Sequence, residues 1–222
     1  MKTLNLDLEY INTLAEENAE KYQSTKPFPY ISFENFLNEY TADKMIEDFP
    51  PINESFYKYD NPLERKYAFD KISELPNSIR DCLIELNSPP FLNFLEKLTG
   101  IEGLIPDPYY RGGGIHQSKR GGKLDIHVDF NRHPKLKLER RLNVLIYLNK
   151  NWKEEYNGDF QIWNGYKDTN DKHVLTELIE KIYPNFNTFA CFNTSEKSYH
   201  GFPEEILCPE GETRKSIALY YY

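Results

Sequence analysis

The feature that most constrains the fold is a change in residue pattern at Arg111. From there to the last residue, short alternating runs of apolar and polar residues, separated by glycines and other turn-forming residues, replace a helical periodicity. Seven of these runs are typical of β-strands: residues 113–118, 123–129, 141–148, 158–163, 186–192, 197–201 and 214–222. Several short strands separated by turn signals predict a β-sandwich or a β-barrel.

Before Arg111, the apolar residues recur mostly at helical spacing. Helices are predicted over three segments: residues 7–22, 74–86 and 89–99. Gly100 is expected to end the third helix, because glycine adopts the left-handed conformation of a helix C-terminus without strain. Thr41 is the expected N-cap of a further helix that runs to Phe49, directly before two prolines.

Two segments of this first part lack helical periodicity. Residues 26–37 are predicted to be extended, and residues 53–69 are expected to form an irregular flap that contains several tyrosines. We therefore predict a mainly β protein with N-terminal helices (α+β class). Residues 1–110 would form a helical support region packed on a β-core of residues 111–222, as one cooperative domain.

Two predicted strands have faces of different character, because successive side chains of a strand point to opposite faces. In residues 141–148, one face is apolar and can pack under the helices, whereas the other can look into the β-core. In residues 214–222, Lys215 points away from the face that carries the strand's arginine and serine. The inward-facing polar residues of the two strands are Asn143, Tyr147, Arg214 and Ser216. This pattern predicts a polar cavity inside the β-core.

The charge distribution argues against a dedicated nucleic-acid-binding protein. The net charge is −8, whereas such proteins carry a basic surface. Basic residues are nevertheless concentrated between Arg111 and Arg141, where nine stand against three acidic residues, a local charge of +6. This segment is either a solvated face of loops and strand ends or a basic rim that attracts an anionic substrate.

The cysteines and the hydropathy pattern indicate a cytoplasmic protein without a membrane partner. Cys82, Cys191 and Cys208 are widely spaced and lack a CxxC motif, which predicts free thiols in a reducing compartment. The N-terminus lacks the basic and apolar regions of a signal peptide. No run approaches the roughly 18 apolar residues that a membrane-spanning helix needs.

His127 and Asp129, in the stretch KLDIHVDFN, are candidate metal ligands. They lie two residues apart in a predicted strand, so both side chains leave the same face. His200, at the end of a later predicted strand, is the best third ligand. Two histidines and one carboxylate can bind one metal ion and leave positions open, in iron and in zinc enzymes alike. The alternative is a pair of hydrogen-bonded polar residues at a strand end.

Arg214 provides a reason for an open metal site. Its guanidinium can bind a carboxylate through two hydrogen bonds, and Ser216 adds a neighbouring donor on the same strand face. An arbitrary arginine is most often a surface residue, but Arg214 lies in a hydrophobic strand. We therefore favour a carboxylate-binding role for Arg214.

In combination, these motifs resemble those of the Fe(II)/2-oxoglutarate-dependent dioxygenases. The H-x-D pair, the distant histidine and the R-x-S motif of the last strand occur in the order that this family shows. Four stretches are similar to its prolyl 4-hydroxylase-like branch: GGGIHQSKRGGKLDIHVDF, RLNVLIYLNKNW, GDFQIW and SYHGFP…RKSIALYYY. The resemblance covers roughly residues 27–222 and is strongest from residue 111 onward.

The resemblance implies a double-stranded β-helix, or jelly roll, with supporting helices. It implies that the three candidate ligands hold Fe(II), that 2-oxoglutarate chelates the iron, and that O2 is the oxidant. Arg214 and Ser216 would bind the distal carboxylate of 2-oxoglutarate, and Tyr147 would donate a hydrogen bond to it. Gln117 stands where prolyl hydroxylases often have a tyrosine near the cosubstrate, and this departure puts a protein-prolyl substrate in doubt.

The implied reaction is hydroxylation of an unactivated C–H bond, with succinate and CO2 as products. The substrate would be a small molecule or a peptidyl proline, with an anionic character if the basic segment contacts it. Four residues are candidate substrate contacts: Asp125, Asn143, Arg120 and Arg132. The alternatives are a non-catalytic jelly-roll binding protein and a cupin-type protein that uses zinc or manganese.

Overall fold

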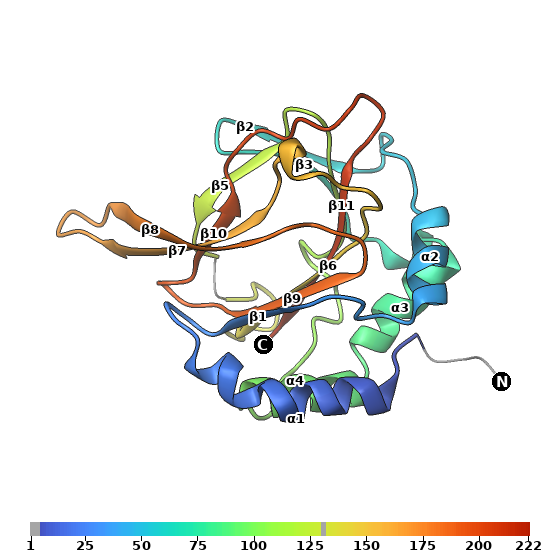
Figure 1. Ribbon diagram of the computed structural model, residues 1–222, viewed down its shortest axis with the longest axis horizontal. Helices are drawn as coiled ribbons and strands as arrows, with labels where there is room; N and C mark the ends of the chain where they lie inside the picture. Colours follow the sequence, from blue (N-terminus) through green and yellow to red (C-terminus); the bar gives the residue numbers. More distant parts are fainter. Residues whose placement is uncertain (1–4, 130–131) are drawn as a thin grey trace.

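The computed structural model describes residues 5–129 and 132–222, which form an antiparallel sheet curled into a jelly roll (Figure 1). The strand order is β1-β9-β6-β11-β4-β3-β5-β10-β7-β8, and β2 pairs with β3. The strands are β1 (Tyr30–Phe33), β2 (Tyr57–Asn61), β3 (Glu64–Phe69), β4 (Gly114–Ser118), β5 (Lys123–His127), β6 (Leu142–Tyr147), β7 (Phe160–Lys167), β8 (His173–Ile182), β9 (Thr188–Asn193), β10 (Tyr199–Phe202) and β11 (Arg214–Tyr221). The predicted jelly roll with supporting helices is confirmed.

Four α-helices pack against the outside of the sheet, and α1 and α4 lie side by side beneath β1 and β9 (Figure 1). The helices are α1 (Leu8–Ser24), α2 (Glu39–Glu47), α3 (Asn77–Leu86) and α4 (Pro89–Thr99). The side chain of Asp7 caps α1 by accepting hydrogen bonds from the backbone N–H groups of Glu9 and Tyr10. As predicted, α4 ends at Gly100, whose φ of 71° is left-handed.

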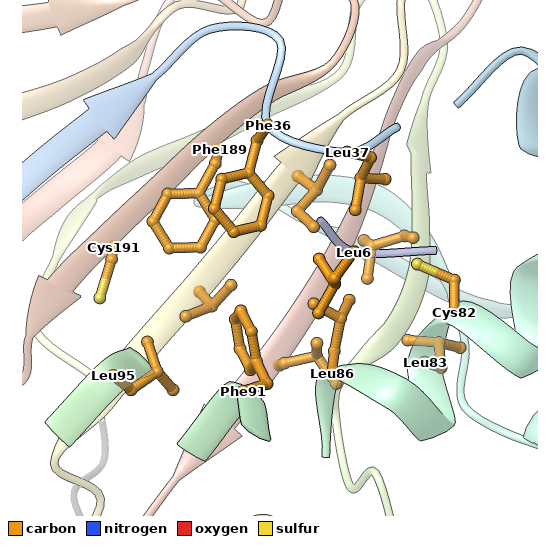
Figure 2. Packing of buried hydrophobic residues seen from close by; sticks show 14 of the residues in the cluster. Leu6, Phe36, Leu37, Cys82, Leu83, Leu86, Phe91, Leu95, Phe189 and Cys191 are labelled. Carbon is orange, nitrogen blue, oxygen red and sulfur yellow. The ribbon is translucent and has the colours of Figure 1, made fainter. Parts of the chain in front are cut away.

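The main hydrophobic core lies between these helices and the outer face of β6, β9 and β11 (Figure 2). Val144 of β6 and Leu219 of β11 are neighbours in register, and both are buried in this core. Phe36 stacks on Phe189 of β9 with ring centroids 4.2 Å apart. Each fully buried side chain of this size contributes about 1.5–3 kcal/mol. The outer faces of β6 and β11 are therefore fixed by this core, and their other faces point into the jelly roll, as predicted.

The first 110 residues contain more β-structure than predicted. The flap predicted for residues 53–69 is wrong, because β2 and β3 form a hairpin there. Asn61 closes its turn by accepting hydrogen bonds from the backbone N–H groups of Leu63 and Glu64. The backbone of β3 pairs with both β4 and β5, which the side-chain pattern does not reveal. The cooperativity of segments 1–110 and 111–222 stays a prediction.

Two local predictions are also wrong. The N-cap of α2 is Asn38, whose side chain accepts a hydrogen bond from Tyr40, whereas Thr41 lies within the helix. His173 lies outside the seven predicted strands but begins β8, and its ring Nδ1 is 3.0 Å from the hydroxyl of Tyr199. The turn end of the β7–β8 hairpin projects from the rest of the molecule (Figure 1).

The three cysteines are free and buried, as predicted. Within residues 5–129 and 132–222, none of the helices combines the length and the apolar character that crossing a membrane requires.

Candidate active site

A cavity inside the jelly roll brings together most of the residues predicted to form a site. The lining comes from strands β3 to β7 and β9 to β11, including the inward faces of β6 and β11, and from Asp129, which follows the end of β5. Seven predicted site residues line it: His127, Asp129, Asn143, Tyr147, His200, Arg214 and Ser216. The strand alternation that predicted this grouping is thus confirmed for β6 and β11.

A β-bulge in β5 sets the orientation of His127. In the antiparallel pair of β5 with β10, His127 lies opposite His200 and Leu124 lies opposite Phe202, so three steps on β5 match two on β10. The additional residue interrupts the alternation of side chains, and Leu124 and His127 therefore both line the cavity. Gly201 lies between the two pairs, where the backbone of β5 comes close: a Cβ atom there would lie 2.6 Å from the Leu124 carbonyl oxygen.

Replacing Gly201 by alanine is expected to destabilise the fold by about 1–3 kcal/mol, the usual cost of overpacking. The added methyl group would meet backbone atoms, which cannot move aside as a flexible side chain can. Gly103→Ala is the control, since its Cβ atom would have no neighbour within 4 Å and only the left-handed backbone opposes it. Chemical denaturation measures both variants, and equal losses would contradict the close approach at the bulge.

The side chains of His127, Asp129 and His200 converge on one point of the cavity. The two histidine Nε2 atoms lie 3.5 Å (His127) and 3.6 Å (His200) from oxygen atoms of Asp129. One ligand atom from each of the three residues can be chosen so that all lie within 4.8 Å of one another. Ligand atoms that bind at about 2.0–2.2 Å around one ion require a comparable spacing.

Both histidines present the correct nitrogen to the cavity. His127 Nδ1 donates to the carbonyl oxygen of Asp125 at 2.9 Å, and His200 Nδ1 donates to that of Ser198 at 2.7 Å. Since the proton of each ring is held at Nδ1, each Nε2 atom has a free lone pair, as a metal ligand needs. Burial lowers the pKa of His200 to about 4, so this ring is neutral near pH 7.

Asp129 is held in the ionised form by its neighbours. Burial alone would raise its pKa, but the contact with His127 and the positive charge of Arg140 outweigh burial and hold the pKa well below its usual range. Arg140 Nη1 lies 3.0 Å from Oδ2 of Asp129, and the side-chain amide of Asn143 donates a short hydrogen bond to the same oxygen. Asn143 therefore contacts a candidate metal ligand, whereas the sequence predicted a substrate contact.

Arg140 was not predicted as a site residue. It lies just before β6, and its guanidinium packs on the ring of Tyr220, 3.8 Å from the ring centroid. The sequence offers only a weak indication of this role, a pair of arginines directly before a strand whose inward face begins with Asn143. The contact between Arg140 and Tyr220 depends on the pairing of β6 with β11, in which Tyr220 lies opposite Asn143.

Replacing Arg140 by methionine is expected to weaken metal binding about 10–100-fold, the usual effect of losing a group that orients a metal ligand. Arg141→Met is the matched control, because Arg141 is exposed and, among the described residues, forms backbone hydrogen bonds with Tyr221 and Thr194. Titration calorimetry with Mn²⁺ measures both affinities. Unchanged affinity in Arg140→Met would show that the ion pair with Asp129 does not matter for metal binding.

Arg214 occupies the cavity without a carboxylate partner. Its side chain is buried, its Nε donates to the carbonyl oxygen of Gly158 at 2.6 Å, and its guanidinium packs between the rings of Phe202 and Tyr147. Among the described residues, no carboxylate lies within ion-pair distance of it. The buried hydroxyl of Tyr147 also has no hydrogen-bond partner among them. Such groups are costly to bury unless a ligand satisfies them.

The structure contradicts the role predicted for Gln117. In β4 the inward residues are His116 and Ser118, whereas Gln117 pairs in register with Lys215, which points outward. The amide of Gln117 donates to Pro50 at 2.9 Å and accepts from Thr213 at 2.8 Å, so both ends are occupied outside the cavity.

Three of the predicted substrate contacts lie outside the cavity. Asp125 is turned out by the β-bulge and forms an ion pair with Lys123 at 2.7 Å. Arg120 donates to the carbonyl oxygens of Leu207 and Cys208, at 2.7 and 3.1 Å. Arg132 is exposed and donates to the carbonyl oxygen of Lys137 at 3.2 Å. These assignments are corrected accordingly. The basic segment mainly stabilises loops and strand ends at these positions.

A jelly roll whose cavity holds two histidines and a carboxylate beside an unpaired, buried arginine defines a class of protein, the non-haem metal-dependent oxygenases. The family described as the 2OG-Fe(II) oxygenase superfamily matches residues 113–222. The chain belongs to this superfamily, and it is a hydroxylating oxygenase that uses Fe(II), 2-oxoglutarate and O2. No curated protein sequence matches the chain significantly.

Solved structures share the fold at low sequence identity. A prolyl hydroxylase from Trichoplax adhaerens, in complex with a hypoxia inducible factor peptide, is 18% identical with a TM-score of 0.64, over 97% of this chain and 91% of that chain. A prolyl-4-hydroxylase from Pseudomonas putida is 11% identical with a TM-score of 0.55, over 94% and 98% of the two chains. HygX from Streptomyces hygroscopicus, with nickel and 2-oxoglutarate bound, is 13% identical with a TM-score of 0.54, over 92% and 85%.

Proposed function

We propose a specific assignment of the cavity residues to the hydroxylation reaction. Fe(II) would be bound by His127, Asp129 and His200, and the distal carboxylate of 2-oxoglutarate by Arg214, Ser216 and Tyr147. The observation that carries the proposal is that one cavity combines a converging cluster of metal ligands with a buried arginine that lacks a carboxylate partner. The cluster of three ligand residues alone is compatible with several classes of metalloenzyme. The cluster together with the buried arginine fits a metal site that also binds a dicarboxylate.

The donor set fits Fe(II). Two neutral imidazoles and one carboxylate are the ligands of the iron(II) facial triad, which leaves three positions open. Each imidazole is oriented by a backbone carbonyl, and Asp129 is oriented by Arg140 and Asn143. In metal proteins such supporting hydrogen bonds fix the direction of each ligand.

The opposite part of the cavity fits the distal carboxylate of 2-oxoglutarate. The guanidinium of Arg214 can donate two parallel hydrogen bonds, and the Tyr147 hydroxyl is free to donate a third. Ser216 lies opposite Tyr147 in the paired strands β11 and β6, which places the two side chains together on the inward face. Because this region is buried, each charged hydrogen bond is stronger than it would be in water.

The residues of the chain have separate tasks in the reaction. When bound, Fe(II) with 2-oxoglutarate and O2 supplies the oxidant that converts a C–H bond of the substrate to C–OH, and 2-oxoglutarate leaves as succinate and CO2. Arg214 and Tyr147 hold the cosubstrate at a fixed distance from the metal. Phe160 and Phe192 pack against the ring of His200, with centroids 5.6 and 4.5 Å away, and exclude water from that side of the site.

For the substrate, we propose an anionic small molecule or a peptidyl proline in an acidic segment. Two fold neighbours are prolyl hydroxylases, and one of them is a complex with a peptide. The anionic character is supported by a second cation in the cavity wall, Lys66, in addition to Arg214. The two alternatives from the sequence are less favourable: a zinc or manganese protein without cosubstrate, or a non-catalytic binding protein, would leave Arg214 without a ligand.

The test is an anaerobic titration of the protein with Fe(II) and then with 2-oxoglutarate. A visible charge-transfer absorption that appears only when both are present is the expected result, because 2-oxoglutarate must chelate the metal to produce it. Admission of O2 should then convert 2-oxoglutarate to succinate, which mass spectrometry detects. Absence of the absorption in protein that binds Fe(II) would contradict the cosubstrate assignment.

A further inference from the structure

We infer that Lys66 is a specificity-determining residue that binds a carboxylate group of the substrate at the wall of the cavity. The inference rests on the proposed function, because it takes the cluster of His127, Asp129 and His200 as the place of reaction. It goes further in naming the group on the substrate that is recognised and the residue that recognises it.

The position of Lys66 follows from the path of β3. This strand begins beside β5, where Glu64 lies opposite Leu124, and continues beside β4, where Ala68 lies opposite His116. Lys66 lies at the crossing from one partner to the other, and its side chain lines the cavity. In Figure 1, β2, β3 and β5 lie together at one end of the jelly roll. Lys66 therefore comes from the N-terminal segment but belongs to the wall that also holds His127.

The side chain of Lys66 is largely shielded from solvent. Its side chain is only 15% exposed, whereas lysine is among the residues least often buried without a partner. Among the described residues, its ion-pair partner is Glu64, at 2.8 Å, and its Nζ lies 5.1 Å from the ring centroid of Tyr59. The aromatic ring restricts the direction of the Lys66 side chain.

The charge of Lys66 reaches into the cavity. The pKa of His116 is lowered to about 3, mainly by burial and next by the charge of Lys66. Among the residues that the structure describes, Lys66 and Arg214 are the two lysine or arginine residues in the cavity wall. Because Arg214 is matched to 2-oxoglutarate, Lys66 is the cation left for the substrate.

In the free protein, the carboxylate of Glu64 can occupy the position that we assign to the substrate carboxylate. It lies two residues before Lys66 on the same face of β3, so the two side chains reach each other without help from another element. Its side chain is 20% exposed, and its backbone N–H is tied to Asn61 at the hairpin turn. The carboxylate can therefore rotate away while the strand stays in place, and a substrate carboxylate would then take over the contact with Lys66.

The chain contains a matched control for this ion pair. Lys58 and Asp60, in the neighbouring strand β2, have the same two-residue spacing and form an ion pair at 2.5 Å. Their side chains are 56% and 55% exposed, and neither lines the cavity. Changes to the two pairs should therefore have different effects on the substrate although their local chemistry is the same.

The experiment measures succinate formation from 2-oxoglutarate in the presence of a panel of probes. The panel contains the free L-amino acids with their C-terminal amides, and proline-centred pentapeptides with Glu or with Gln on both sides of the proline. Each pair consists of a member with a carboxylate and a neutral counterpart without it. The members with the carboxylate are expected to stimulate turnover. Lys66→Met should raise the KM of the best acidic member about 10–100-fold, as expected for a charge-assisted hydrogen bond.

Three further variants make the result specific. Lys66→Arg should keep the KM within a few fold of the wild type, Glu64→Gln should lower it by freeing the ammonium group, and Lys58→Met should leave it unchanged. All variants are also titrated anaerobically with 2-oxoglutarate. Lys66→Met should bind 2-oxoglutarate as the wild type does, which shows that it folds and that Lys66 does not hold the cosubstrate.

Several results would overturn the inference. The first is that no anionic member of the panel stimulates turnover. The second is that Lys66→Met changes the KM of acids and amides equally. The third is that Lys66→Met loses as much 2-oxoglutarate affinity as a variant of Arg214. Failure of the proposed function would look different, since the wild-type protein would then bind no 2-oxoglutarate at its metal site. The two failures are thus distinguishable in the same titration.

Discussion

Replacing Asp129 by alanine is expected to reduce succinate formation to the background level. The change removes the anionic ligand of the proposed metal site, and it leaves the positive charge of Arg140 beside the two imidazoles with no compensating carboxylate. A site of that composition repels a divalent cation, whereas the intact cluster attracts one. Both the affinity for Mn²⁺, by titration calorimetry, and turnover with Fe(II) should be lost.

The matched control for this prediction is Asp43→Ala. Asp43 lies on α2, is partly exposed and forms an ion pair with Lys150 at 2.7 Å, far from the cavity in the fold. Exposed ion pairs of this kind contribute about 0–1 kcal/mol, so metal affinity and turnover should stay at the wild-type level. Retained iron-dependent turnover in Asp129→Ala, with a melting temperature like that of the control, would contradict the assignment of Asp129 as a ligand.

Replacing Arg214 by methionine is expected to weaken 2-oxoglutarate binding by about 30–5000-fold, which corresponds to the loss of one partner of a buried charge pair, about 2–5 kcal/mol. Methionine fills a similar length but cannot donate hydrogen bonds to the distal carboxylate. The metal affinity should change little, because Arg214 does not contact the ligand cluster. Anaerobic titration of the Fe(II)-loaded variant with 2-oxoglutarate gives the dissociation constant.

Two companions separate recognition of the cosubstrate from stability. Arg214→Lys should have an intermediate affinity, since it keeps a charge but loses the two parallel hydrogen bonds of the guanidinium. Arg80→Met is the control for the loss of one arginine, because Arg80 lies on α3, is partly exposed and does not line the cavity. An unchanged dissociation constant in Arg214→Met would place the distal carboxylate elsewhere in the cavity.

Alternation within single strands was enough to predict much of the candidate site. In β6 and β11, apolar residues on one face pack under the helices, so Asn143, Tyr147, Arg214 and Ser216 must share the other face. In a strand with one buried face, a shift by one residue would move every side chain to the wrong side, and the pattern is therefore decisive. The same reasoning, with the H-x-D spacing, brought His127 and Asp129 together.

Strand alternation gave the wrong side-chain direction where a β-bulge interrupts it. A second error arose where a residue was placed in the cavity because of the family resemblance. The β-bulge in β5 turns Asp125 away from the cavity, although it lies two residues before His127. Gln117 was assigned to the cavity from a family pattern, but the pairing of β4 with β11 shows that His116 holds the inward position.

The sequence by itself determined the class of fold, the helices α1, α3 and α4, seven of the strands and the candidate ligands. Those features depend on local periodicity and on residue spacing, which are written along the chain. Only the tertiary structure revealed the hairpin β2–β3, the contact of Arg140 with Asp129, and Lys66 in the cavity wall. The last two depend on contacts between separate strands, which no local pattern specifies, and β2 has no apolar face from which a strand could be predicted.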